Sequence, residues 1–162
     1  MFKGASQTGL FTKSGGGWMM IGRSRLVSAL LLVAAAIYGI IPPIVDLGES
    51  HTFHPSWPPH ARFHMVWLLG TNSTLALIVA WLVLAGPAEQ RETRLRFASL
   101  LGVAALGGFF VATFTQSAYG GALHDPTAQV SLIFGLDGNL VAFTPALLIQ
   151  LVAAWLAHRR PG

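Results

Sequence analysis

The sequence has no cysteine and few charged residues, and both absences narrow what the protein can be. Without cysteine there are no disulfides, thiolate nucleophiles, iron–sulfur clusters or thiolate zinc sites. Only 10% of the residues are charged, against roughly 25% in a typical soluble domain. Because 53% of the residues are hydrophobic and the mean hydropathy is +0.60, the chain cannot cover a water-facing surface. We therefore expect an integral membrane protein.

The basic residues lie at the ends of apolar runs. The formal net charge is +4 and the sequence pI is about 10.4. In a soluble protein, such values would suggest that nucleic acid is a partner. Beside apolar runs, the same residues are typical signals of membrane topology. We expect the lipid bilayer as the surrounding partner and no nucleic acid.

Four apolar runs are long enough, or nearly so, for the roughly 20 residues with which a helix crosses a bilayer. They predict an all-α four-helix bundle, threaded up-down-up-down, in a transmembrane domain at residues 25–162. The Gly/Ser/Thr-rich residues 1–24 are expected to form a mobile cytoplasmic tail. The runs lie at 26–45, 64–85, 97–118 and 140–157.

Small residues recur at every fourth position of the third run, at Ala104, Gly108 and Ala112. This spacing lets a neighbouring backbone come close in a membrane. It predicts that the third run packs at the centre of the bundle through these residues.

Lysine and arginine near helix ends stay on the cytoplasmic side, so their distribution predicts orientation. With both termini cytoplasmic, nine of the ten lie inside and only Arg62 lies outside. We expect a multi-pass protein of the cell inner membrane whose histidine-bearing loops are extracytoplasmic. The nine are Lys3, Lys13, Arg23, Arg25, Arg91, Arg94, Arg96, Arg159 and Arg160.

The stretch 46–64 between the first two runs holds four of the six histidines. Ser56 and the prolines after Trp57 are typical of a helix start, with the serine as N-cap. In a helix that begins here, His60 and His64 form an i, i+4 pair on one face. Ionisable groups at a membrane surface are costly unless they have a function, so the pair is a candidate for acid/base catalysis.

A histidine pair at this spacing is also a familiar metal-binding geometry. His51 and His54, together with His60, His64 and a carboxylate from Asp46 or Glu49, could supply three or more ligands to a divalent metal. Without metal, the same groups could transfer protons, with Asp46 and Glu49 as partners. The third interpretation is structural: the histidines anchor the chain at the headgroups or bond carbonyls freed by the prolines.

The loop between the third and fourth runs adds a second candidate cluster. His124 stands directly before Asp125, and a neighbouring carboxylate can orient an imidazole for proton transfer. Asp125 before Pro126 is equally typical of a turn. In an up-down bundle both outer loops lie on the same side of the membrane, and each carries acidic groups that are costly at a lipid boundary unless they are paired or hydrated. We therefore expect the loops to meet and to bring His124 near the His60/His64 pair.

Polar and aromatic residues in and beside the runs are candidates for binding a substrate. Interhelical hydrogen bonding is the alternative role for those inside the membrane. The candidates are Trp57, Trp67, Thr71, Asn72, Gln116, Tyr119, Asn139 and Gln150.

The motifs HPSWPPHARFH, YGGALHDP and GLDGNLVAF give the chain a family resemblance. It resembles a group of small bacterial four-helix membrane proteins with a Pro-x-Trp-Pro-Pro-His-Ala-x-Phe-His loop, which implies the fold but no particular activity. In size and polar-lined bundle it is loosely similar to the emopamil-binding-type sterol isomerases. That likeness implies histidine and acidic groups that move a proton on a lipophilic substrate.

The spacings of His60 with His64 and of His51 with His54 are also similar to those of membrane hydroxylases and desaturases. Those enzymes use more histidines, usually on the cytosolic side, and both differences count against a di-iron oxygenase.

The sequence therefore favours a membrane enzyme that isomerises or cyclises a lipophilic small molecule, because such reactions need only placed acids and bases. Two alternatives stay open. One is a non-catalytic subunit of a larger membrane complex, and the other is a carrier or metal-handling protein. An enclosed cavity at the histidines favours the enzyme, and an open flank favours the subunit.

Overall fold

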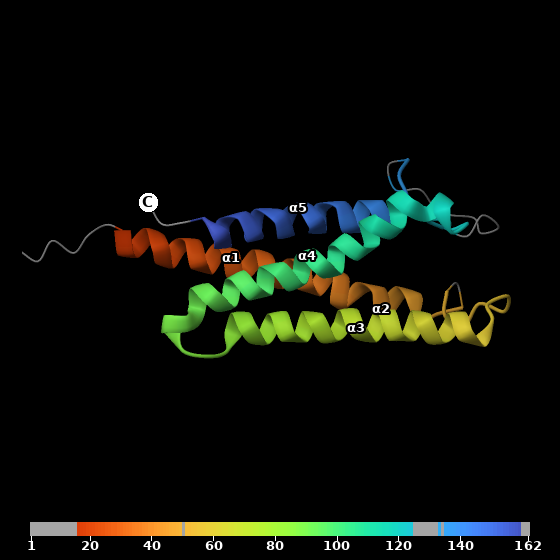
Figure 1. Cartoon of the computed structure of the whole chain (residues 1–162), viewed down its shortest axis with the longest axis horizontal. Coiled ribbons are helices and arrows are strands. Elements are labelled where there is room, and N and C mark those ends of the chain that lie inside the picture. The colour runs from red at the N-terminus through yellow and green to blue at the C-terminus, as the bar shows by residue number, and fades with distance from the viewer. Residues whose placement is uncertain (1–15, 50, 125–132, 134, 160–162) are drawn as a thin grey trace, which may run out of the picture.

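The computed structural model describes residues 16–49, 51–124, 133 and 135–159, and this part of the chain is helical without a named strand (Figure 1). Four of its helical spans are long and apolar enough to cross a membrane. The elements are α1 Gly16–Gly39, α2 Ile41–Asp46, α3 Pro59–Leu84, η1 Ala88–Gln90, α4 Arg91–Thr115, η2 Gln116–Ala118 and α5 Gly138–His158.

The first span is interrupted at its prolines and begins earlier than expected. α1 starts at Gly16, within the stretch that the sequence assigned to a tail, and residues 1–15 lie outside the described part. Pro42 and Pro43 lack the N–H groups that would bond back into α1, so the helix ends at Gly39. The prolines then occupy the first turn of α2, where missing donors cost little.

α3 begins at the predicted proline pair but without the predicted serine cap. Its first residue is Pro59, and its N-cap is Pro58 in an extended conformation. Ser56 instead bonds the ring of His54. The helix start is thus set by the backbone preferences of proline, and a side-chain cap contributes nothing there.

α5 is capped by Asp137, whose Oδ1 accepts from the backbone N–H of Asn139 at 2.8 Å. A carboxylate at this position satisfies an orphan donor and opposes the positive end of the helix dipole. Pro145 lies inside α5 without ending it.

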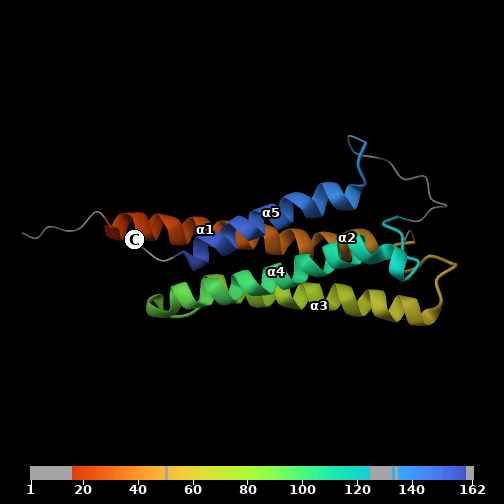
Figure 2. The same ribbon diagram turned by 45° about the horizontal axis from the view of Figure 1, so that its top comes forward.

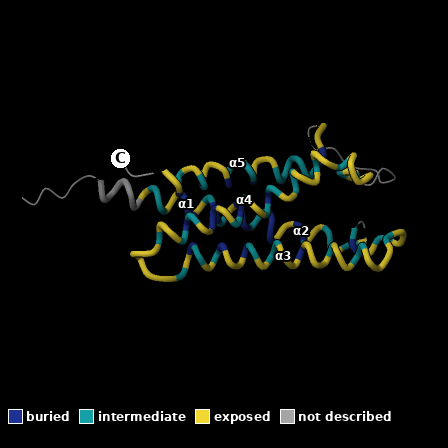
Figure 3. Tube along the Cα trace, viewed as in Figure 1, coloured by how far each residue is buried: buried dark blue, intermediate teal, exposed yellow. Residues whose placement is uncertain are grey.

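α1 and α4 form the centre of the bundle. They contact each other, and each packs against both α3 and α5, while α3 and α5 lie on opposite flanks and do not touch (Figures 1 and 2). Buried residues line the facing sides of the helices (Figure 3). The core is built largely from alanine and aliphatic residues, including Val27, Leu31, Ala34, Val79, Val83, Leu95, Ala98, Leu106, Ala146 and Ala153.

Two glycines mark where helices approach closely. Gly39 of α1 lies against Ala76 of α3, and its carbonyl accepts from the Ser73 hydroxyl at 2.8 Å. Gly102 of α4 lies against the side-chain amide of Gln150, where an added Cβ would come within 2.5 Å of three amide atoms. Small residues therefore permit the α1–α3 and α4–α5 contacts.

The third apolar run does lie centrally, but through a different face from the expected one. Ala104, Gly108 and Ala112 are exposed in this chain, and a Cβ added at Gly108 would meet nothing within 4 Å. The buried small pair is Ala98 and Gly102, also four residues apart. The spacing was right and the helix face was wrong, because small residues recur on more than one face of α4.

One end of the bundle is tied together by arginines. Arg23 of α1 donates to the Arg159 carbonyl at 2.9 Å, and Arg96 of α4 donates to the Ala157 carbonyl at 3.1 Å. Arg94 donates to the Leu82 carbonyl in the last turn of α3 at 2.8 Å and to the Pro87 carbonyl in the connection after it at 3.0 Å. Hydrogen bonds from these charged donors satisfy carbonyls at helix ends. We call this the basic end, and the opposite end the histidine end.

Candidate functional site

The predicted His60/His64 pair is formed on the first two turns of α3. The two Nε2 atoms lie 3.0 Å apart, and the rings meet edge to face with centroids 4.4 Å apart. Both side chains are exposed. A hydrogen bond between two Nε2 atoms needs one protonated and one unprotonated nitrogen. The pair therefore holds a donor and an acceptor side by side.

Aromatic residues of α3 hold the second ring of the pair. The ring of Trp67 stacks on His64 with centroids 5.8 Å apart and planes inclined by 24°. Phe63 meets His64 edge on, at 5.8 Å between centroids. Contacts on two sides restrict the His64 ring, which leaves His60 as the more open partner.

An open groove of about 400 Å³ continues from Trp67 along the outer face of α3. It is lined by Trp67, Gly70, Thr71, Thr74 and Leu75. Trp67 and Thr71, two of the predicted substrate-binding residues, therefore lie together on the exposed flank of the helix. The space beside Trp67 is thus an open surface groove and not an enclosed cavity.

The loop before α3 holds His54 by local bonds. The His54 Nδ1 lies 2.7 Å from the Ser56 hydroxyl, and Arg62 donates to the His54 carbonyl at 3.1 Å. The Nε of Arg62 is buried and has no hydrogen-bond partner. Arg62, the cation expected outside, therefore fastens the loop onto the first turns of α3.

Asp46 and His51 form another group at the start of the same loop. The His51 Nε2 is 3.8 Å from an Asp46 carboxylate oxygen, a long ion pair when the histidine is protonated. Thr52 is buried and donates to the Asp46 carbonyl at 2.7 Å. Glu49 is exposed nearby. Asp46 is thus the partner of a histidine, as the sequence predicted, and that histidine is His51.

His124 is paired with a different acid from the one expected. Its Nδ1 lies 3.0 Å from Oδ2 of Asp137, the nearly buried cap of α5. Asn139 joins this group by donating to the Leu123 carbonyl at 3.4 Å. Asp125, the predicted neighbour, lies outside the described residues. A carboxylate orients the His124 imidazole, as expected, and Asp137 supplies it.

The expected meeting of the two outer loops stays a prediction, because residues 125–132 of the second loop lie outside the described part. Within the described part of the chain, no hydrogen bond or ion pair joins His124 or Asp137 to His60 or His64. The starts of α3 and α5 lie on opposite flanks of the bundle (Figures 1 and 2).

The histidines predicted as metal ligands are divided in the same way. Among the described residues, no group of three or more histidine, aspartate or glutamate side chains is close enough to hold one ion. His60 and His64 converge, while His51 lies beside Asp46 and His54 bonds Ser56. Two imidazoles are fewer than the ligand sets of typical protein zinc sites.

The other predicted substrate residues are spread along the bundle. Gln150 is buried between α4 and α5 and donates to the Ser99 carbonyl at 2.7 Å, so it bonds helices together. The Tyr119 hydroxyl donates to the Ala112 carbonyl at 2.9 Å. Gln116 accepts backbone bonds in the turn after α4. Trp57 and Asn72 are half-buried, on the loop and on α3 respectively.

Sequence reasoning missed three side chains that organise the histidines: Ser56 on His54, Arg62 on the loop, and Asp137 on His124. A signal for Asp137 was present, because an acidic residue directly before a Gly-Asn start is a typical helix cap. The roles of Ser56 and Arg62 depend on the fold of the loop, for which no periodicity gives a signal.

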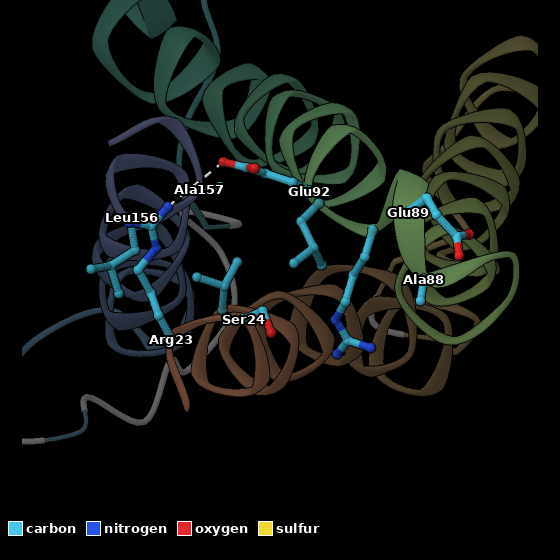
Figure 4. Close-up of a pocket in the computed structure, with 10 residues that line it drawn as sticks. Arg23, Ser24, Ala88, Glu89, Glu92, Leu156 and Ala157 are labelled. Atoms are coloured by element: carbon cyan, nitrogen blue, oxygen red, sulfur yellow. Dashed lines mark ion pairs between the residues drawn. The ribbon is translucent and has the colours of Figure 1, made fainter. Parts of the chain in front are cut away.

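A cavity of about 270 Å³ lies at the basic end, between α1, the start of α4 and the end of α5 (Figure 4). None of the predicted catalytic, substrate-binding or metal-binding residues lines it.

Comparison of the chain with protein-family models, curated proteins and solved structures finds no match.

Proposed function

We propose that the protein is a small integral-membrane enzyme that binds a lipophilic molecule on the outer face of α3 and transfers protons with His60 and His64. The observation that carries this proposal is the convergence of the two Nε2 atoms, 3.0 Å apart, with the His64 ring stacked on Trp67, which lines the groove. An acid/base isomerase or cyclase needs one group that donates a proton and one that accepts a proton.

The groove provides a way in for a lipophilic molecule. Its open side faces outward from a helix that is long and apolar enough to cross a membrane, so a molecule dissolved in lipid could enter sideways. Trp67 and Leu75 offer apolar contact, while Thr71 and Thr74 offer hydroxyls. Such a mixture of apolar walls and few polar groups is typical of small-molecule sites.

The reaction that fits the pair is a proton shift along an unsaturated substrate. One histidine, as an imidazolium, donates its Nε2 proton to one carbon and becomes neutral. The other, a neutral imidazole with an unprotonated Nε2, accepts a proton from another carbon as the double bond moves and becomes the imidazolium. Atoms balance, because the substrate gains and loses one proton. The pair ends with its protons exchanged and is reset by exchange with water through the exposed side of His60.

The threading and orientation belong to the same proposal. We place both termini in the cytoplasm of a bacterial cell, α3 and α5 entering from outside, and the protein in the inner membrane. The gathering of Arg23, Arg94, Arg96 and Arg159 at one end supports this orientation, because basic residues remain cytoplasmic.

Solvent deuterium provides the test. Purified protein in vesicles of host lipid extract is incubated in heavy water, and the lipids are then analysed by mass spectrometry. An acid/base isomerase adds solvent deuterium to its substrate, so one lipid species should gain mass with wild-type protein and with His158→Gln. His60→Gln and His64→Gln should lose the gain. Equal labelling in all four proteins would contradict the proposal.

A second candidate is favoured by the openness of the site. The groove is not enclosed, and α3 lies on the flank of the bundle, where a helix of another membrane subunit could cover Gly70 and Thr74. Small residues at this spacing are typical of helix contacts in membranes. No deuterium gain in any lipid, with co-purification of a membrane partner that Gly70→Leu abolishes, would favour this subunit role.

A further inference from the structure

The cavity at the basic end combines cationic and apolar walls. Arg23 and Ser24 of α1 and Arg91 of α4 provide polar atoms, while Val27, Leu95 and Leu156 provide apolar ones. Figure 4 shows Arg23 reaching from α1 toward Glu92, close to Leu156 and Ala157 of α5. The cavity lies between α1, the start of α4 and the end of α5.

Arg91 is a partly buried cation that has no carboxylate partner among the described residues. Its terminal nitrogen donates to the Ser28 hydroxyl at 3.0 Å, but its Nε is buried and has no hydrogen-bond partner. No carboxylate forms an ion pair with it among the residues that the structure describes. Withdrawing a charge from water is costly unless an opposite charge compensates it.

The glutamates at this end do not provide that compensation. Glu92 also lines the cavity, but its carboxylate forms a close ion pair with Arg96 at 2.8 Å. Its ion pair with Arg23 is longer, at 3.8 Å. Glu89 lines the rim and is exposed. Across the described basic end, the two glutamates face six arginines: Arg23, Arg25, Arg91, Arg94, Arg96 and Arg159.

We propose that this cavity binds the phosphate group of an anionic phospholipid. Arg91 and Arg23 contact the phosphate oxygens, since guanidinium and phosphate form strong charge-assisted hydrogen bonds. The acyl chains follow the apolar wall of Val27, Leu95 and Leu156 toward the lipid. Basic pockets between membrane helices are known to take such headgroups. The apolar wall favours a phospholipid over free phosphate, which shares only the headgroup chemistry.

This lipid site is independent of the histidine site, which lies at the other end of the bundle. The bound phosphate would join α1 to α4 through Arg23 and Arg91, next to the contacts that already join α5. We therefore infer a stabilising lipid that strengthens the basic end.

Native mass spectrometry of the full-length protein in detergent tests the proposal. Phosphatidylglycerol is titrated against wild-type protein, Arg91→Gln and Arg23→Gln, with phosphatidylcholine as the neutral-headgroup lipid. Removing one guanidinium should weaken phosphatidylglycerol binding about tenfold and leave the weaker phosphatidylcholine binding unchanged. Added phosphatidylglycerol should also raise the melting temperature of wild-type protein more than that of either variant.

Arg25→Gln is the matched control, because it removes the same charge at the same end without lining the cavity. It should bind phosphatidylglycerol like wild type. The proposal is overturned if Arg25→Gln weakens binding as much as Arg91→Gln, which would indicate diffuse attraction. It is also overturned if phosphatidylcholine binds equally well, or if inorganic phosphate binds as tightly as the lipid. Should Arg91→Gln not fold, Arg23→Gln alone decides.

Discussion

The two ends of this bundle are held together in different ways. At the basic end, side chains bond residues far away in the sequence: Arg23 reaches Arg159, and Arg91 reaches Ser28. At the histidine end, bonds are mostly local: His60 pairs with His64, and His54 with Ser56. The first kind of contact joins helices to one another, while the second shapes a single loop or helix turn.

The basic end is therefore expected to stabilise the bundle, and the histidine end to carry the proposed reaction. Long-range bonds restrict how α1, α4 and α5 lie relative to each other, so the basic end should open last. Local bonds at the histidine end orient the imidazoles without joining the flanking helices α3 and α5. A site that must admit a molecule from the membrane benefits from this freedom, because lids and binding regions belong to the less stable parts of proteins.

The largest effect is expected where α4 and α5 are closest. In Gly102→Ala the new methyl group would lie 2.5 Å from the Gln150 amide, so the glutamine must move and lose its bond to Ser99. We expect a loss of about 1–3 kcal/mol in the free energy of unfolding. Unfolding of the purified protein by denaturing detergent, followed by helical circular dichroism, measures it.

Gly108→Ala is the matched control on the same helix. A Cβ there meets nothing within 4 Å, and both variants gain the same helix propensity. Equal stability of the two variants would mean that the α4–α5 contact does not depend on Gly102.

A smaller effect is expected when one tie at the basic end is removed. Arg96→Gln loses both the hydrogen bond to the Ala157 carbonyl and the ion pair with Glu92. Because the guanidinium is partly exposed, we expect a loss of about 1 kcal/mol. The same unfolding measurement applies, with Arg25→Gln as control. A loss no greater than that of the control would remove the claim that these ties stabilise the bundle.

A still smaller effect on stability is expected at the histidine end. His60→Gln removes an exposed local bond and should change the free energy of unfolding by less than about 0.5 kcal/mol, although it abolishes the proposed proton transfer. Stability and solvent-deuterium incorporation are measured on the same preparation. If both fall together, the histidine pair is structural and the contrast between the two ends is wrong.

No stability change is expected from Ser56→Cys, which tests the orientation of the two ends. The chain has no other cysteine, and residue 56 lies on the exposed loop before α3. A membrane-impermeant thiol reagent added to intact cells should label it if the histidine end is extracytoplasmic. Labelling only after the membrane is opened would show that the histidine end is cytoplasmic and contradict the proposed orientation.

The sequence was sufficient to predict the helical spans and the His60/His64 pair, because both depend on local patterns. Apolar length predicts spans, and i, i+4 spacing places two side chains together on any helix. Which helices meet is not a local property. The seam at Ala98 and Gly102, the pairing of His124 with Asp137, and the cavity beside Arg91 all depend on contacts across the bundle.

The central claim is that His60 and His64 act as one proton-transferring unit, and a double-variant cycle on solvent-deuterium incorporation tests it most directly. Residues that act as a unit show non-additive losses. We predict that His60→Gln and His64→Gln each abolish incorporation and that the double variant is no worse than either. Losses that multiply, or a single variant with wild-type incorporation, would contradict the account.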